Sequence, residues 1–143
     1  MITTVQKQQC LKACAIFASL EAEAVGVLAA AMEAEAFGDS EEVCAFGEPA
    51  ECVYVVMDGE LAVFLPGADR PIRHLRAGDV LGEYGMFTGK RTTTIVAAGR
   101  ATLLSMEYPR FKAFLTQYPD AMYALLATAV ERLSAAEAKL RSK

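Results

Sequence analysis

The sequence LGEYGMFTGKRTTT, residues 81–94, is the most informative segment of this chain. It is rich in glycine, has helical character in its middle, and is bounded by strand-like sequence on both sides. Backbone N–H groups of a short helix beginning near Gly82 can point at an anion, and the guanidinium of Arg91 can bind phosphate oxygens in a bidentate way. Glu83 can accept a hydrogen bond from a sugar hydroxyl. The stretch therefore predicts a site for a sugar phosphate.

This stretch resembles the phosphate-binding cassette of the cyclic nucleotide-binding domain family. The glycines that punctuate the β-roll of that family also occur here in order, at Gly47, Gly59, Gly78 and Gly82. The resemblance covers about residues 17–133 and is to a catabolite activator protein-like effector domain without the DNA-binding helix-turn-helix. It implies an α+β fold, mainly β, in which a β-roll or jelly-roll barrel is flanked by N-terminal helices and a long C-terminal helix.

The resemblance also implies which residues bind the ligand. Glu83 is expected on the ribose, Arg91 on the phosphate, and Thr92 beside the phosphate and the purine edge. Each has a simpler alternative: a first-turn helix acid, a surface arginine at a strand start, and an ordinary β-branched strand residue. The ligand-binding residues implied in this way are Gly82, Glu83, Tyr84, Gly85, Arg91 and Thr92.

The cassette departs from the usual family pattern in three ways. Gly85 stands where the family often has alanine, no proline precedes Arg91, and the segment that ends at Arg91 is one residue shorter than is common. A one-residue slip would move the guanidinium out of bidentate reach and leave Lys90 as a weaker point charge. In the catabolite activator protein two late hydroxyl residues contact the base. The positions that correspond to them here are Ala136 and Glu137.

Length and charge limit the class of protein. The 143 residues predict a single domain, with helices at about 4–33, the β-roll at about 34–106 and C-terminal helices at about 107–141. No apolar run reaches the roughly 18 residues of a spanning helix, and Met1 begins no signal-peptide pattern, so we expect a cytoplasmic protein and no membrane partner. A net charge of −4 argues against DNA as a partner.

Local patterns predict the individual elements. Helices are expected at about 4–17 and 20–32, with Ser19 as the N-cap of the second. An Asp58-Gly59 type I′ turn is expected to join strands 52–57 and 60–65 as a hairpin, and Pro66-Gly67 to form the next turn. Further strands are expected at 72–75, 93–98 and 102–106.

Residues 120–140 have the periodicity of an amphipathic helix. The apolar seam of this helix either pairs with a second chain or packs against the β-roll of the same chain. Glu131 and Arg132 are expected beside the seam as solvated charges. The seam consists of Met122, Leu126, Ala129, Leu133, Ala136 and Leu140.

Residue chemistry predicts no catalytic or metal site. His74 is the only histidine, and no carboxylate pair has spacing suited to acid–base work. Cys10, Cys14, Cys44 and Cys52 lack the close spacing of a zinc or iron–sulfur site, which favours reduced thiols over a metal or redox sensor.

The functional hypothesis is a non-enzymatic sensor of cAMP or cGMP that needs no other cofactor and acts through its C-terminal helix. Its expected partners are the nucleotide, a second copy of the chain along that helix, and a protein that the residues do not identify. The alternative is an interaction module of the same fold that binds no nucleotide. A third hypothesis is a redox or metal sensor that uses the cysteines.

Overall fold

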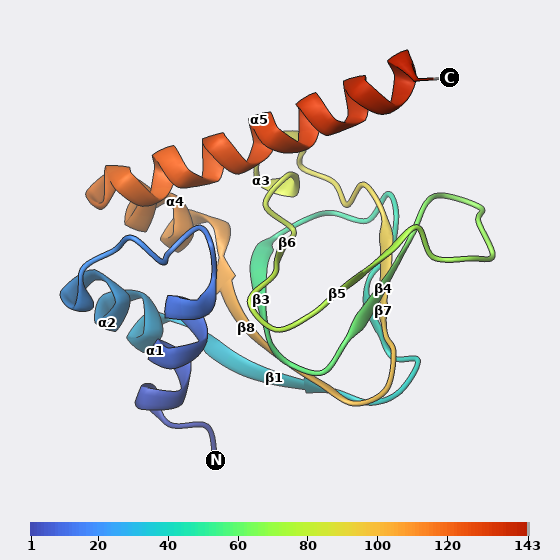
Figure 1. Cartoon of the computed structure of the whole chain (residues 1–143). Helices are drawn as coiled ribbons and strands as arrows, with labels where there is room; N and C mark the ends of the chain where they lie inside the picture. The colour runs from blue at the N-terminus through green and yellow to red at the C-terminus, as the bar shows by residue number, and fades with distance from the viewer. Residues whose placement is uncertain (143) are drawn as a thin grey trace.

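The computed structural model describes residues 1–142. Two N-terminal helices lead into eight strands. One short helix, α3, lies between β6 and β7, and two further helices follow the last strand. In Figure 1, α5 lies across α3 and α4, and the N-terminal helices pack beside the strands. The helices are α1 (Thr4–Ala13), α2 (Ala22–Ala31), α3 (Gly85–Thr88), α4 (Tyr108–Gln117) and α5 (Pro119–Arg141).

The strands form two antiparallel sheets of four strands each, in the orders β1-β8-β3-β6 and β2-β7-β4-β5. This arrangement confirms the predicted α+β roll with helices at both ends of the chain. The strands are β1 (Glu33–Phe37), β2 (Glu42–Cys44), β3 (Cys52–Asp58), β4 (Leu61–Phe64), β5 (Arg73–Leu75), β6 (Val80–Leu81), β7 (Thr94–Ala97) and β8 (Ala101–Glu107).

The predicted hairpin around Asp58-Gly59 is wrong. Both strands are present, but β3 pairs with β8 in one sheet, whereas β4 pairs with β7 in the other. Gly59 has φ +88°, and a Cβ atom there would lie 2.3 Å from the carbonyl oxygen of Arg100. The chain therefore turns a corner between sheets, with its backbone pressed against the connection that precedes β8.

The N-terminal helices differ from prediction at their ends. Thr3 and Gln6 form a capping box at the start of α1, with Gln6 N–H donating to Thr3 Oγ1 at 3.1 Å and Thr3 N–H donating to Gln6 Oε1 at 2.8 Å. The helix ends at Ala13 rather than near residue 17. Ser19 is not the cap of α2: the chain makes successive turns through residues 14–20, and Glu21 takes the N-cap position without a side-chain bond.

Strand β3 joins two hydrophobic clusters because its side chains alternate between faces. Val53 and Val55 pack with the helices, whereas Tyr54 and Val56 pack between the two sheets. Burying each aliphatic side chain of this kind contributes roughly 1.5–3 kcal/mol. Strand β3 is therefore fixed from both sides, and it pairs with β6, which leads into the cassette.

Helix α5 rests on the rest of the chain by its N-terminal half. Ala121 and Leu125 are its buried residues. Leu126, Leu133 and Leu140 are 62%, 60% and 72% exposed, although Leu126 lines a cavity between α5 and the cassette and Leu133 lines one between α5 and β5. No helix within residues 1–142 is both long and apolar enough to cross a membrane.

Candidate functional site

The cassette begins where β6 ends. Gly82 has φ +85°, which interrupts regular structure, and helix α3 starts only at Gly85 and has four residues. The prediction of a helix beginning near Gly82 is therefore wrong. A Cβ atom on Gly82 would lie 2.5 Å from Arg91 Nη1 and 3.0 Å from the carbonyl oxygen of Cys52. Glycine is favoured there because φ is positive and because the carbonyl oxygen of Cys52 and the Arg91 guanidinium occupy that space.

Arg91 is 8% exposed, so it is not the surface arginine that the simpler alternative describes. Its Nη2 donates to the carbonyl oxygen of Cys52 at 2.9 Å, and its Nη1 donates to the Tyr108 hydroxyl at 3.1 Å. The Tyr108 hydroxyl donates in turn to the carbonyl oxygen of Gly82. The guanidinium carbon lies 5.8 Å from the centre of the Tyr54 ring.

No carboxylate within residues 1–142 forms an ion pair with Arg91. A buried cation without an anionic partner is costly, so this position favours an anion supplied from outside the chain. Arg91 lies against Gly82, whereas Lys90 is exposed.

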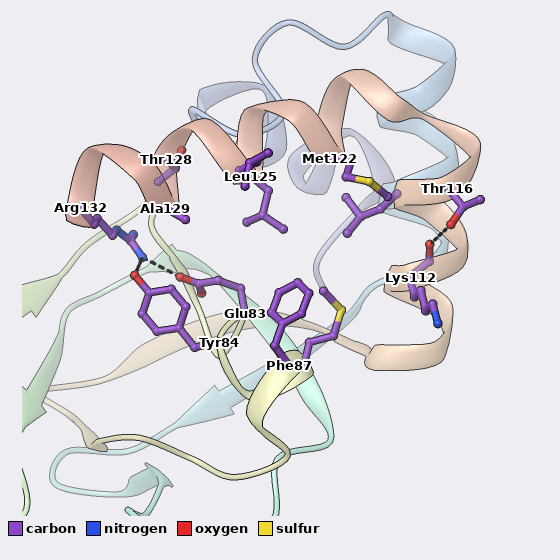
Figure 2. Close-up of a pocket in the computed structure, with 13 residues that line it drawn as sticks. Glu83, Tyr84, Phe87, Lys112, Thr116, Met122, Leu125, Thr128, Ala129 and Arg132 are labelled. Atoms are coloured by element: carbon purple, nitrogen blue, oxygen red, sulfur yellow. Dashed lines mark hydrogen bonds and ion pairs between the residues drawn. The ribbon is translucent and has the colours of Figure 1, made fainter. Parts of the chain in front are cut away.

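Glu83 is 6% exposed and makes an ion pair that the sequence did not predict. Its Oε1 accepts from Arg132 Nη1 at 2.6 Å, and its Oε2 is buried without a hydrogen-bond partner. Arg132 also donates to the Tyr84 hydroxyl at 3.2 Å (Figure 2). The prediction that Arg132 is a solvated charge beside the α5 seam is therefore wrong.

The electrostatics agree with this pairing. Burial alone would lower the pKa of Arg132, but its hydrogen bond to the Tyr84 hydroxyl and the carboxylate of Glu83 raise that pKa overall. Burial also raises the pKa of the Tyr108 hydroxyl, against the opposing effect of the Arg91 charge. Tyr108 therefore stays protonated and can accept from Arg91 while it donates to Gly82.

All six predicted site residues line one cavity of about 180 Å³, between the cassette and the second sheet. Arg73 of β5 lines it too, and sequence reasoning had given that residue no role. A second, mostly apolar cavity of about 460 Å³ lies between α3, α4 and α5 (Figure 2). Glu83 and Tyr84 line both cavities, so they connect the cassette with the space beneath α5.

The remaining reactive side chains do not converge. Cys10, Cys14, Cys44 and Cys52 are free thiols, and burial raises the pKa of Cys14 to about 11. Within residues 1–142 no group of three or more histidine, cysteine or acidic side chains is placed to hold a metal ion. His74 Nε2 lies 3.9 Å from Glu60 Oε1 at the surface.

Solved structures identify the fold. The chain superposes on the catabolite activator protein of Thermus thermophilus with a TM-score of 0.82 and 22% identity, over 88% of this chain and 61% of that one. It superposes on the regulatory domain of Toxoplasma gondii PKA, solved with cAMP, with a TM-score of 0.76 and 23% identity, over 90% of this chain and 50% of that one. The β-roll with its long C-terminal helix is therefore the fold of these regulatory proteins.

The family follows from the sequence match. Residues 34–118, more than half of the chain, match the family described as "Cyclic nucleotide-binding domain". The chain belongs to the cyclic nucleotide-binding domain family, as the cassette resemblance predicted.

Curated relatives include channels that are much longer than this chain. Cyclic nucleotide-gated channel beta-3 of Canis lupus familiaris is 33% identical over 90 residues, which are 59% of this chain and 11% of the channel. A cyclic nucleotide-gated potassium channel of Mesorhizobium japonicum is 27% identical over 133 residues, which are 92% of this chain and 36% of that protein. The chain thus spans only a part of the relatives it matches.

Proposed function

We propose that this chain is a regulatory, non-enzymatic module that binds cAMP or cGMP in the cavity beside Arg91. The observation that carries the proposal is the buried guanidinium of Arg91, which has no anionic partner within residues 1–142. Two of its five N–H donors bind protein oxygen atoms, so donors remain for a phosphate. A cyclic phosphate carries one negative charge, which would neutralise this cation.

The other residues of the cavity have matching roles in the proposal. Gly82 lets Arg91 approach the backbone closely, Gly85 leaves room for the Tyr108 hydroxyl, and Tyr84 forms part of the wall. Glu83 accepts a ribose hydroxyl on its unpartnered Oε2. Thr92, exposed at the rim, offers its backbone N–H to the phosphate and its hydroxyl to the base.

The proposed output is a change in the position or mobility of α5. This helix contacts the cassette through Arg132, so movement of the cassette around a phosphate alters its support. The channel relatives combine related domains with longer chains, and we propose that this module likewise acts on a partner, either another protein or a second copy.

Calorimetric titration tests the binding proposal. Protein freed of co-purified nucleotide is titrated with cAMP and with cGMP, and we expect heat with one-to-one stoichiometry from at least one of them. Absence of binding by both nucleotides would contradict the proposal.

That result would favour a second candidate function, an interaction module of the same fold that binds no nucleotide. The exposure of Leu126, Leu133 and Leu140 along α5 is the observation that supports this alternative.

A further inference from the structure

The mostly apolar cavity between α3, α4 and α5 is larger than the cavity beside Arg91 (Figure 2). Its volume of about 460 Å³ is about three times the roughly 150 Å³ that hold one benzene molecule in an apolar protein cavity. The cavity therefore has room for a hydrocarbon chain on the order of a dozen carbon atoms or more. Its apolar walls are formed by Met86, Phe87, Leu115, Met122, Leu125 and Leu126.

Large apolar side chains of this cavity remain exposed to water. Phe87 is 76% exposed, Met122 is 44% exposed and Leu126 is 62% exposed. A single exposed apolar residue is ordinary, but these three gather at one cavity. An apolar ligand that covered them would remove this surface from water, which is the main source of affinity for a ligand of that kind.

Most polar side chains that line the cavity are already paired. Thr116 and Thr128 each donate a hydrogen bond to the carbonyl oxygen four residues earlier, at 2.9 Å and 3.0 Å. Arg132 is paired with Glu83. The ammonium group of Lys112, in contrast, forms no ion pair within residues 1–142. Lys112 is therefore the charged group that a ligand can pair with at this cavity.

The charges on the two sides of the cavity determine how a charged ligand would lie. Figure 2 shows Lys112 on one side and Glu83 on the other, with Phe87 between them. The buried carboxylate of Glu83 repels an anion, whereas the ammonium group of Lys112 attracts one. A ligand with an anionic head and an apolar tail would therefore place its head at Lys112 and its tail along Phe87.

We propose that this cavity is a second ligand site, and that it binds one fatty acid anion of about 10–16 carbon atoms. The carboxylate lies at Lys112, and the hydrocarbon chain fills the space between α3 and α5. Three helices of one chain form the walls, so a single free hydrocarbon chain fits the cavity better than a membrane surface or a partner protein. The proposal does not depend on nucleotide binding, because it does not involve Arg91.

The test is calorimetric titration with saturated carboxylates from octanoate to hexadecanoate, each kept below the concentration at which it forms micelles. We expect one-to-one binding whose affinity rises about threefold to fourfold with each methylene group and then levels off when the cavity is full. Dodecanol has the same chain length as dodecanoate but no charge. It should bind about twofold to fivefold more weakly, since an exposed ion pair contributes little.

Matched variants test the cation and the apolar wall separately. Lys112→Ala should weaken dodecanoate about twofold to fivefold and leave dodecanol unchanged. Arg110→Ala removes an exposed cation of α4 that lies outside the cavity, and it should change neither ligand.

Phe87→Asp should weaken both ligands about tenfold or more, because it replaces an apolar wall with a charge. Tyr123 of α5 is 75% exposed, much like Phe87, but does not line the cavity, so Tyr123→Asp should bind both ligands as the wild type does. Circular dichroism shows that each variant is folded.

Absence of binding by every carboxylate would overturn the proposal. So would a stoichiometry above one, or an affinity that still rises at hexadecanoate, because either would indicate adsorption to the surface. Binding to phosphatidylglycerol vesicles without binding of monomeric carboxylates would indicate a membrane-facing surface instead. Binding that weakens as the protein concentration rises would show that a second copy of the chain occupies the cavity. None of these results affects the proposed nucleotide site, which calorimetry with cAMP and cGMP tests separately.

Discussion

Arg91 is the residue whose removal should cost the most binding. A partly buried phosphate left without its ion partner costs roughly 3–5 kcal/mol, which is a loss of about a hundredfold or more in affinity. Lys90 is the matched control, since it is the adjacent cation and is exposed. We expect Arg91→Ala to abolish or severely weaken nucleotide binding in calorimetry and Lys90→Ala to change it by less than about fivefold. Equal effects would mean that the arginine is not the phosphate ligand.

Thr92 should confer only weak selectivity between cAMP and cGMP. It can accept a hydrogen bond from the guanine amino group, but it is exposed at the cavity rim, so we expect a preference for cGMP on the order of 1 kcal/mol. Thr92→Ala should remove that preference, as measured by calorimetry with both nucleotides. A strong cAMP preference that survives the substitution would place base recognition elsewhere, in α5.

Single residues of the site differed in how well the sequence predicted them. Glu83 and Arg91 belong to one contiguous motif, so their types and spacing were sufficient to bring them to one cavity. Arg132 lies 49 positions from Glu83, and Tyr108 lies 17 positions from Arg91. Those contacts depend on how α4 and α5 pack on the cassette, which no local pattern encodes.

Helix α5 has a largely exposed apolar seam, and we predict that it pairs with a second copy of the chain. Leu126, Leu133 and Leu140 recur at heptad spacing and are all exposed. Leu133→Asp would bury a carboxylate in the paired seam and should dissociate the dimer in sedimentation experiments. Because Leu133 is 60% exposed, the substitution should leave the circular dichroism spectrum unchanged.

A control on the same helix distinguishes loss of pairing from loss of fold. Leu125 is 8% exposed and belongs to the hydrophobic cluster that packs with the helices. Leu125→Asp should therefore reduce the circular dichroism signal of the native fold. A wild type that stays monomeric at high concentration, with and without nucleotide, would remove the dimer and leave α5 as an intramolecular lid.

The positions of the helices and strands were easier to predict from the sequence than the strands that pair with one another and the face that a helix buries. Short apolar runs rich in β-forming residues located β3 and β4 correctly, yet the turn signal at Asp58-Gly59 suggested that they pair with each other. A glycine with positive φ serves a sheet corner as well as a hairpin, and the deciding contact is with Arg100, far away in sequence. The periodicity of α5 was read correctly, whereas the face it buries depended on tertiary packing.

The whole molecule should unfold as one unit, because its two hydrophobic clusters share β3. Val53 and Val55 belong to the cluster with the helices, and Tyr54 and Val56 to the cluster inside the roll. Neither cluster can lose this strand without exposing the other, which is the condition for a cooperative transition. The sequence predicted the roll and its flanking helices, but the shared strand became evident only from the sheet order.

Nucleotide binding should therefore stabilise the helices and the roll together. At a hundred times Kd a ligand that binds only the native state adds about 2.7 kcal/mol, which for a chain of this size corresponds to a rise in Tm of roughly 5–10 °C. Far-ultraviolet circular dichroism follows the helices and near-ultraviolet tyrosine signals follow side-chain packing; both should shift equally with the ligand. Arg91→Ala should show no shift. Two separate transitions, or a shift confined to one signal, would show that the cavity and the helices are not coupled through β3.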